Sequence, residues 1–266
     1  MKRREWIQKN KRKWITLGIG LTLLVLGVVL TAVTRRAAIA EGASAVAKVP
    51  FALGLIMILT GIFVPLAGLI PKKKTTDVRT LSMAALFAAL CYIGFTYCKI
   101  DIPVGMEKTA FHLGNVFCVL AALFLGGLWG GMAGAVGMTI ADLTTAYVTS
   151  APKTFLLKLC IGLITGFVAH KIFKLSQDRE DRKLPLTAAT AISCAAGMAF
   201  NMVADPLVGY FYKMYVLGIP QEAAGIWAKI GAVTTSVNAV VAVIAATVLY
   251  MALRKPMKRT DLLPKL

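Results

Sequence analysis

Residues 14–34, WITLGIGLTLLVLGVVLTAVT, form an uninterrupted run without a charged side chain. A helix needs about 17–25 mostly apolar residues to cross the hydrocarbon core of a bilayer, so this run predicts a transmembrane helix. Comparable runs recur and make up eight candidate spans: Trp14–Thr34, Pro50–Ile70, Leu81–Cys98, Phe111–Leu128, Met132–Val148, Phe155–Phe173, Leu186–Ala204 and Ile226–Leu253. The predicted fold class is therefore an all-α membrane protein with about eight transmembrane helices.

The composition and charge of the chain agree with this class. Its 266 residues are 58% hydrophobic, above the roughly 45–50% apolar content of soluble domains. Most of the 30 Lys and Arg residues lie on one side of the predicted spans, in segments 2–13, 72–79, 171–183 and 254–265. Positive charge collects on the cytoplasmic side of membrane proteins. We therefore expect a multi-pass protein of a bacterial-type plasma membrane with both termini cytoplasmic, and the net charge of +18 does not indicate nucleic-acid binding.

The sequence shows no motif for a metal, a cofactor or nucleotide hydrolysis. Its five cysteines stand singly in apolar segments, without the Cys/His spacing that is typical of a metal site. A GxxxxGK[ST] phosphate loop and a GxSxG nucleophile turn are also absent. We expect no metal ligands and no cofactor, and if transport uses ATP, another subunit must hydrolyse it.

The chain divides into two predicted parts. Residues 1–77 hold an N-terminal transmembrane hairpin and a basic cytoplasmic linker, Pro71–Asp77, and neither span of the hairpin contains an ionisable side chain. Residues 78–266 hold six further spans and all of the ionisable residues that fall inside a span. Binding chemistry is therefore expected in the second part.

Polar residues of the second part gather in the half of the membrane that faces away from the basic loops. His112 and Asn115 are three apart, on one face of the predicted fourth span. Asp142 follows the inner turn by about 14 residues, or roughly 21 Å of helix. Burying charge in hydrocarbon costs several kcal/mol or more, so such residues usually serve a site or a pairing. The candidate substrate-binding residues are His112, Asn115, Asp142, Lys158, Asn201, Asp205 and Asn238.

A purely structural network is the alternative interpretation of these residues. In that case Asp142 would pair with Lys158 and Asp205 with Lys229, which would stabilise the bundle without binding a solute. The confinement of the polar set to the outer half favours a site that captures a polar solute from outside.

Small residues in the third span form a second candidate surface. In Met83–Leu90, MAALFAAL, Ala84 and Ala88 are four apart, and so are Ala85 and Ala89. Small side chains at this spacing allow helices to approach closely in a membrane. The approaching helix belongs either to the same bundle or to a partner. The Gly-rich segment Gly126–Gly131 predicts a tight inner turn.

Three segments resemble a known family. They are FHLGNVFCVLAALFLGG at 111–127, GAVGMTIADL at 134–143 and APKTFLLKLCIGLITGFV at 151–168. In order and spacing they resemble the substrate-binding S components of energy-coupling factor (ECF) transporters, and the resemblance covers roughly residues 78–256. The N-terminal hairpin departs from the usual six-span architecture of that family.

The resemblance implies a function and a set of partners. Members of the family are six-helix bundles that bind a water-soluble vitamin or related micronutrient near the outer face. They deliver it together with a membrane T component and two cytoplasmic ATPase subunits. The small-residue motif implies that Ala84, Ala85, Ala88 and Ala89 dock onto the T component. The chain itself is then a binding subunit and not an enzyme.

Two other classes of function remain open from the sequence. A self-sufficient secondary carrier would need polar residues through the full depth of the membrane, whereas the inner half is nearly bare. A membrane-embedded enzyme could use His112, Asp142 and Asp205 in acid–base or metal roles, although a tighter motif would be expected.

Overall fold

The computed structural model describes residues 2–39, 49–51, 53–54, 56–58, 61, 78–104, 107–177 and 184–260. The chain forms two compact units: residues 1–75 with Val148–Pro152, and residues 76–147 with 153–266. The predicted linker Pro71–Asp77, most of the second span and most of the basic loop after 176 lie outside the described residues. The predicted division after residue 77 stays a prediction.

The first unit contains a long helix, α1 (Lys2–Ile39), whose apolar window Leu17–Thr34 corresponds to the first predicted span. A shorter apolar helical segment covers Val49–Ile58. A Cβ atom added to Gly27 would lie 2.6 Å from the carbonyl oxygen of Gly54. The glycines therefore allow the two helical segments to pack backbone to backbone, as small residues do in membranes.

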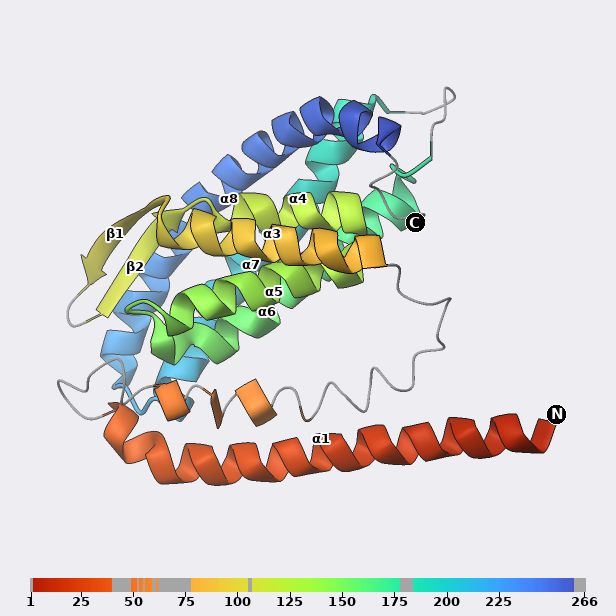
Figure 1. The fold of residues 1–266 in the computed structure, drawn as a ribbon. Coiled ribbons are helices and arrows are strands. Elements are labelled where there is room, and N and C mark those ends of the chain that lie inside the picture. Colours follow the sequence, from red (N-terminus) through yellow and green to blue (C-terminus); the bar gives the residue numbers. More distant parts are fainter. Residues whose placement is uncertain are drawn as a thin grey trace. The chain divides into compact units, whose positions relative to one another are not determined.

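The second unit is a helical bundle with a β-hairpin at one end (Figure 1). Its elements, in chain order, are α3 (Val78–Thr96), β1 (Lys99–Val104), β2 (Glu107–His112), α4 (Gly114–Leu125), α5 (Gly127–Leu143), α6 (Ala151–Phe167), α7 (Leu186–Phe211) and α8 (Gln221–Arg259). Helix α6 continues into the π-helical turn η2 (Val168–Ile172), and α7 continues into η3 (Tyr212–Val216). A short 3-10 helix, η1 (Val148–Ser150), precedes α6 in the chain and is counted, with the first two residues of α6, in the first unit.

Helix α4 is the centre of this bundle. It packs against α3, α5 and α8, and all of its residues except Phe117 are buried. A helix that is apolar on every side is expected to be enclosed by others. Near its end, the ring of Phe124 lies 6.1 Å from the ring of Phe87 and 4.9 Å from that of Tyr250. The core of the unit is therefore built around α4.

The Gly-rich segment after α4 is helical, so the prediction of a turn over Gly126–Gly131 was wrong for most of its length. Only Gly126 breaks the helix, with a φ of 81° that favours glycine. The following glycines are used for helix contacts: a Cβ on Gly130 would collide with the backbone of Ala122, and one on Gly162 with that of Gly131. Helix α5 therefore packs very closely on α4 and on α6.

The β-hairpin was not predicted from the sequence. Strands β1 and β2 pair antiparallel, from Lys99 opposite His112 to Val104 opposite Glu107. Polar and apolar residues alternate in Lys99–Ile102, which is the pattern of a strand, but the run is short and adjoins a long apolar helix. His112 ends β2, whereas Asn115 lies in α4. The prediction that these two residues share one helix face was therefore wrong.

Five helical segments of the described chain are long and apolar enough to cross a membrane: Leu17–Thr34, Val78–Thr96, Val148–Ile172, Leu186–Val216 and Gln221–Arg259. Helix α4 is shorter than predicted, because the hairpin takes up the first residues of the fourth span and the helix break lies at Gly126. Helix α5 begins and ends earlier than the predicted fifth span, because the residues after Gly126 are already helical. The all-α membrane fold is confirmed, and the exact number of eight spans stays a prediction.

The contact between α5 and α6 yields a stability prediction. Gly162→Ala should destabilise the protein by about 1–3 kcal/mol, because the new methyl group would overlap the backbone of Gly131. Gly225→Ala in α8 is the matched control, since no atom lies within 4 Å of its added Cβ. The control should be neutral or slightly stabilising. Thermal unfolding in detergent measures both, and equal melting temperatures would contradict the close contact.

Candidate functional site

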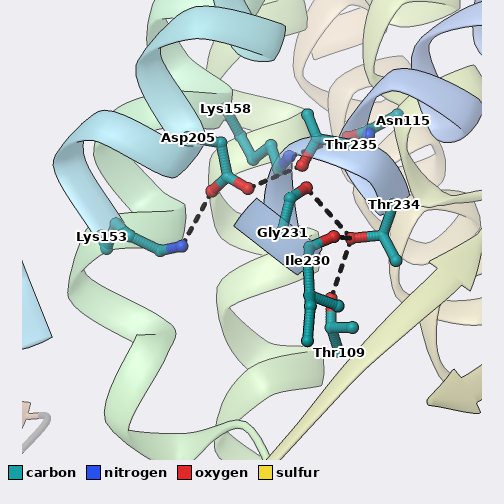
Figure 2. Close-up of polar contacts among 9 residues, drawn as sticks. All are labelled: Thr109, Asn115, Lys153, Lys158, Asp205, Ile230, Gly231, Thr234 and Thr235. Atoms are coloured by element: carbon teal, nitrogen blue, oxygen red, sulfur yellow. Dashed lines mark hydrogen bonds and ion pairs between the residues drawn. The ribbon is translucent and has the colours of Figure 1, made fainter. Parts of the chain in front are cut away.

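Most of the candidate binding residues meet at the hairpin end of the second unit. The carboxylate of Asp205 on α7 accepts hydrogen bonds from Lys153 on α6 and from Thr235 on α8, each at 2.8 Å (Figure 2). Lys153 and Asp205 form a salt bridge whose side chains are 16% and 23% exposed. The predicted pairing of Asp205 with Lys229 was wrong, because Lys153 takes that position and Lys229 is exposed.

Lys158 lies one turn deeper along α6 and is 7% exposed. Its ammonium group donates a hydrogen bond of 2.8 Å to the side-chain oxygen of Asn115, at the start of α4. It also interacts electrostatically with Asp205 and Asp142. A buried ammonium needs such partners because desolvation is costly. Two of the candidate binding residues, Asn115 and Lys158, are therefore in direct contact.

Asp142 and Asn201 each keep a buried polar atom without a partner. Asp142, near the end of α5, is 2% exposed, and Asn201 on α7 is 1% exposed. Thr154 hydrogen-bonds to the carboxyl group of Asp142. Among the described residues, however, nothing bonds to Oδ2 of Asp142 or to Oδ1 of Asn201. Leaving such a group unpaired costs about 1–3 kcal/mol, which is unusual outside functional sites.

Asn238 has a different environment from that expected of a ligand contact. Its amide nitrogen donates to the carbonyl of Ala110, and its oxygen accepts from the backbone N–H of His112, both at 3.0 Å. Both ends of the amide are therefore occupied by strand β2. A second link joins Thr109 of β2 to Thr234 of α8 at 3.1 Å (Figure 2). Asn238 positions the hairpin on α8.

The imidazole of His112 is enclosed beside the same residues. Its ring lies 4.6 Å from the ring of Phe95, and its Nδ1 has no partner among the described residues. Burial, and next the charge of Lys158, lower the pKa of His112 to about 3. The ring is therefore neutral at physiological pH, with one nitrogen able to donate and the other to accept.

A second polar group holds the other strand of the hairpin. The hydroxyl of Tyr147, between α5 and α6, donates to Oδ1 of Asp101 on β1 at 2.9 Å. Lys99 pairs with the same carboxylate at 3.3 Å, and its ammonium lies 5.0 Å from the ring of Tyr147. Burial, together with the bond to Asp101, raises the pKa of Tyr147, so its phenol remains a donor.

Sequence reasoning missed Lys153, Thr109, Thr234 and Thr235. Lys153 stands two residues before the predicted span Phe155–Phe173, so no sequence pattern places it among the buried residues. Thr109 lies between two predicted spans, and Thr234 and Thr235 lie inside an apolar one. The sequence does not indicate which group the hydroxyl of a threonine will bond, because that depends on the neighbouring helix or strand. No group of three or more His, Cys, Asp or Glu side chains that could hold a metal ion occurs in the described part of the chain.

The structure separates the two alanine pairs of α3. Ala84 is buried, and the backbone of Ala88 lies against Gly137 of α5. Ala85 and Ala89 are exposed. The close approach predicted from small residues therefore occurs inside the bundle for the first pair. Only Ala85 and Ala89 remain available to a partner.

The chain was compared with known proteins. The family model for the ECF-type riboflavin transporter S component matches residues 75–255, which is well over half of the chain. The searches of curated proteins and of solved structures found no match. The family match confirms the resemblance drawn from the sequence motifs, and it agrees with an apolar helical bundle that has a buried polar cluster at one end. The chain therefore belongs to the family of ECF-type riboflavin transporter S components, the membrane-embedded substrate-binding subunits of these transporters.

Proposed function

We propose that this protein captures riboflavin, or a closely related neutral and polar micronutrient, at the hairpin end of its second unit. The observation that carries the proposal is the set of buried polar atoms without a partner at that end: Oδ2 of Asp142, Oδ1 of Asn201 and Nδ1 of His112. A polar solute with N–H and O–H donors would satisfy the two oxygens. Nδ1 of His112 can either donate or accept a hydrogen bond, depending on the tautomer of the neutral imidazole.

The balance of charge supports a neutral ligand. Two carboxylates, Asp142 and Asp205, face two ammonium groups, Lys153 and Lys158. Both ammonium groups already have a partner: Lys153 forms a salt bridge with Asp205, and Lys158 donates to Asn115. An anionic solute would have to displace these partners, which leaves a buried charge unpaired. Riboflavin, which the family name specifies, has no net charge at neutral pH and carries an imide N–H and several hydroxyls.

The basic residues at the other end of the bundle support a direction of capture. Lys171 lies in η2, which continues α6, and Lys255, Lys258 and Arg259 lie at the end of α8. Because positive charge favours the cytoplasmic side, the hairpin end is proposed to face the outside, with both termini in the cytoplasm. Solute would then be captured from outside the plasma membrane.

The exposed face of α3 supports a docking role. Ala85 and Ala89 are exposed and four residues apart, so another helix can approach the backbone of α3 there. We assign this face to the T component of the transporter, which would join it to the two ATPase subunits. The N-terminal hairpin falls before the family match and has no assigned role.

The binding site can be tested by removing its unpaired polar atoms. Asp142→Ala and Asn201→Ala should each weaken riboflavin binding roughly ten- to a hundredfold, the effect of losing a well-formed hydrogen bond. Quenching of riboflavin fluorescence by the purified protein measures the affinity. Lys229→Ala is the control, since Lys229 is exposed outside the network.

Two results would contradict the assignment. If wild-type protein does not bind riboflavin while native mass spectrometry finds another co-purified solute, the substrate is different. If both variants bind riboflavin as the wild type does, the ligand lies elsewhere. Loss of folding in both variants, seen by size-exclusion chromatography, would instead support the purely structural network.

The docking face can be tested separately from the binding site. Ala85→Trp and Ala89→Trp should leave riboflavin affinity unchanged but prevent co-purification with the T component and the ATPases, because the indole would hold the helices apart. Val240→Trp on α8, at a position that is 58% exposed, is the matched control and should assemble normally.

A buried member of the same motif gives the opposite pattern. Ala84→Trp should destabilise the subunit itself, because Ala84 is 7% exposed and faces the core. Normal assembly and transport by both exposed-face variants would show that the partner docks elsewhere.

A further inference from the structure

The β-hairpin is attached along both of its edges, and the two attachments differ in kind. On the β2 edge, Asn238 bonds the backbone of Ala110 and His112, and Thr234 bonds Thr109. Asn238 and Thr234 are 6% and 3% exposed. Water cannot readily replace buried hydrogen bonds, so breaking them is costly. The β2 edge is therefore fixed to α8.

The β1 edge is held by contacts that water can reach. Asp101 is 32% exposed and Lys99 is 16% exposed where they meet. Tyr147 reaches this pair from the segment between α5 and α6 and donates its hydroxyl to Asp101. When such a contact opens, water takes the place of each partner at little cost. The β1 edge is therefore the one that opens more readily.

The Tyr147 contact is connected to the candidate binding residues through one ring. Phe95, at the end of α3, lies 5.4 Å from the ring of Tyr147 in an edge-to-face arrangement and 4.6 Å from the ring of His112. The ammonium of Lys99 lies near the rings of both Phe95 and Tyr147. A movement of β1 would therefore disturb the surroundings of His112.

We propose that Tyr147 and Asp101 form a latch on the β1 edge of the hairpin, and that this latch sets how fast the ligand enters and leaves. The hairpin turns about its buried attachment to α8, and the hydrogen bond from Tyr147 to Asp101 holds it closed. Both are positioning residues, since they act through the hairpin. The proposal rests on the proposed function, in which the ligand binds at the hairpin end.

The test separates the rates of binding from the affinity. Stopped-flow quenching of riboflavin fluorescence should show that Tyr147→Phe raises both the association and the dissociation rate constants roughly three- to tenfold. The dissociation constant should change less than about twofold, because opening precedes both entry and exit. If Tyr147 had only a structural role, its substitution would lower the melting temperature or the affinity, and the two rate constants would not rise together.

Matched variants make the test specific. Tyr97→Phe also removes a phenol hydroxyl at the hairpin end, from a side chain that is 74% exposed, and should not alter the rates. Asp101→Ala removes the acceptor from the other side, so it should reproduce the effect of Tyr147→Phe even if that variant folds poorly. The double variant should be no faster than either single one. Rates of Tyr147→Phe and Asp101→Ala that equal those of Tyr97→Phe would overturn the latch.

A measurement without ligand keeps the latch and the substrate assignment distinguishable. Spin labels at Ile100→Cys on β1 and Lys229→Cys on α8, in a Cys98→Ser background, report the distance between the two elements by pulsed electron resonance. Tyr147→Phe should broaden the distance distribution, and an unchanged distribution would overturn the latch. If the labels show the change but riboflavin does not bind to the wild type, the latch stands and the substrate assignment fails.

Discussion

The ammonium group of Lys158 imposes the constraint on which much of the second unit depends. It is 7% exposed in a bundle whose surroundings are apolar, and an isolated charge in such a place is too costly to keep. Asn115 supplies a direct acceptor, and the carboxylates of Asp142 and Asp205 supply compensating charge. Each comes from a different helix, so α4, α5, α6 and α7 must meet at one depth.

Close packing of the helices makes this meeting geometrically feasible. Glycines in α5 and α6 remove the side chains that would hold the helices apart, with Gly131 and Gly162 nearly in backbone contact. Short polar side chains such as Asn115 can then reach across from one helix to the next. The apolar half of the bundle and its polar end are therefore parts of one arrangement. Substitutions that widen the contacts between helices should also loosen the polar cluster, even when they lie far from it along the chain.

The sequence was sufficient for the class of fold and for the end of the bundle at which polar residues gather. The bilayer selects long apolar runs and an uneven distribution of Lys and Arg, and both can be counted in the sequence without knowing which residues are in contact. The partners of individual residues could not be predicted in the same way. Lys153 and Lys229 are both lysines near the end of a predicted span, and only the packing of α6 against α7 places the first beside Asp205. The hairpin was missed because six-residue strands carry little pattern beside long helices.

The way in which Asn238 holds β2 has a consequence for how the binding surface can change during evolution. Its amide bonds only main-chain atoms, at Ala110 and His112. Every residue type except proline offers those same atoms, so the bonds from Asn238 do not depend on the side chains at these two positions, whereas the second link needs the hydroxyl of Thr109. The hairpin can therefore accept new side chains at Ala110 and His112, and with them a preference for another solute, while the bonds from Asn238 still hold β2 on α8. Asn238 thus helps to fix where β2 lies without fixing which side chains the strand presents.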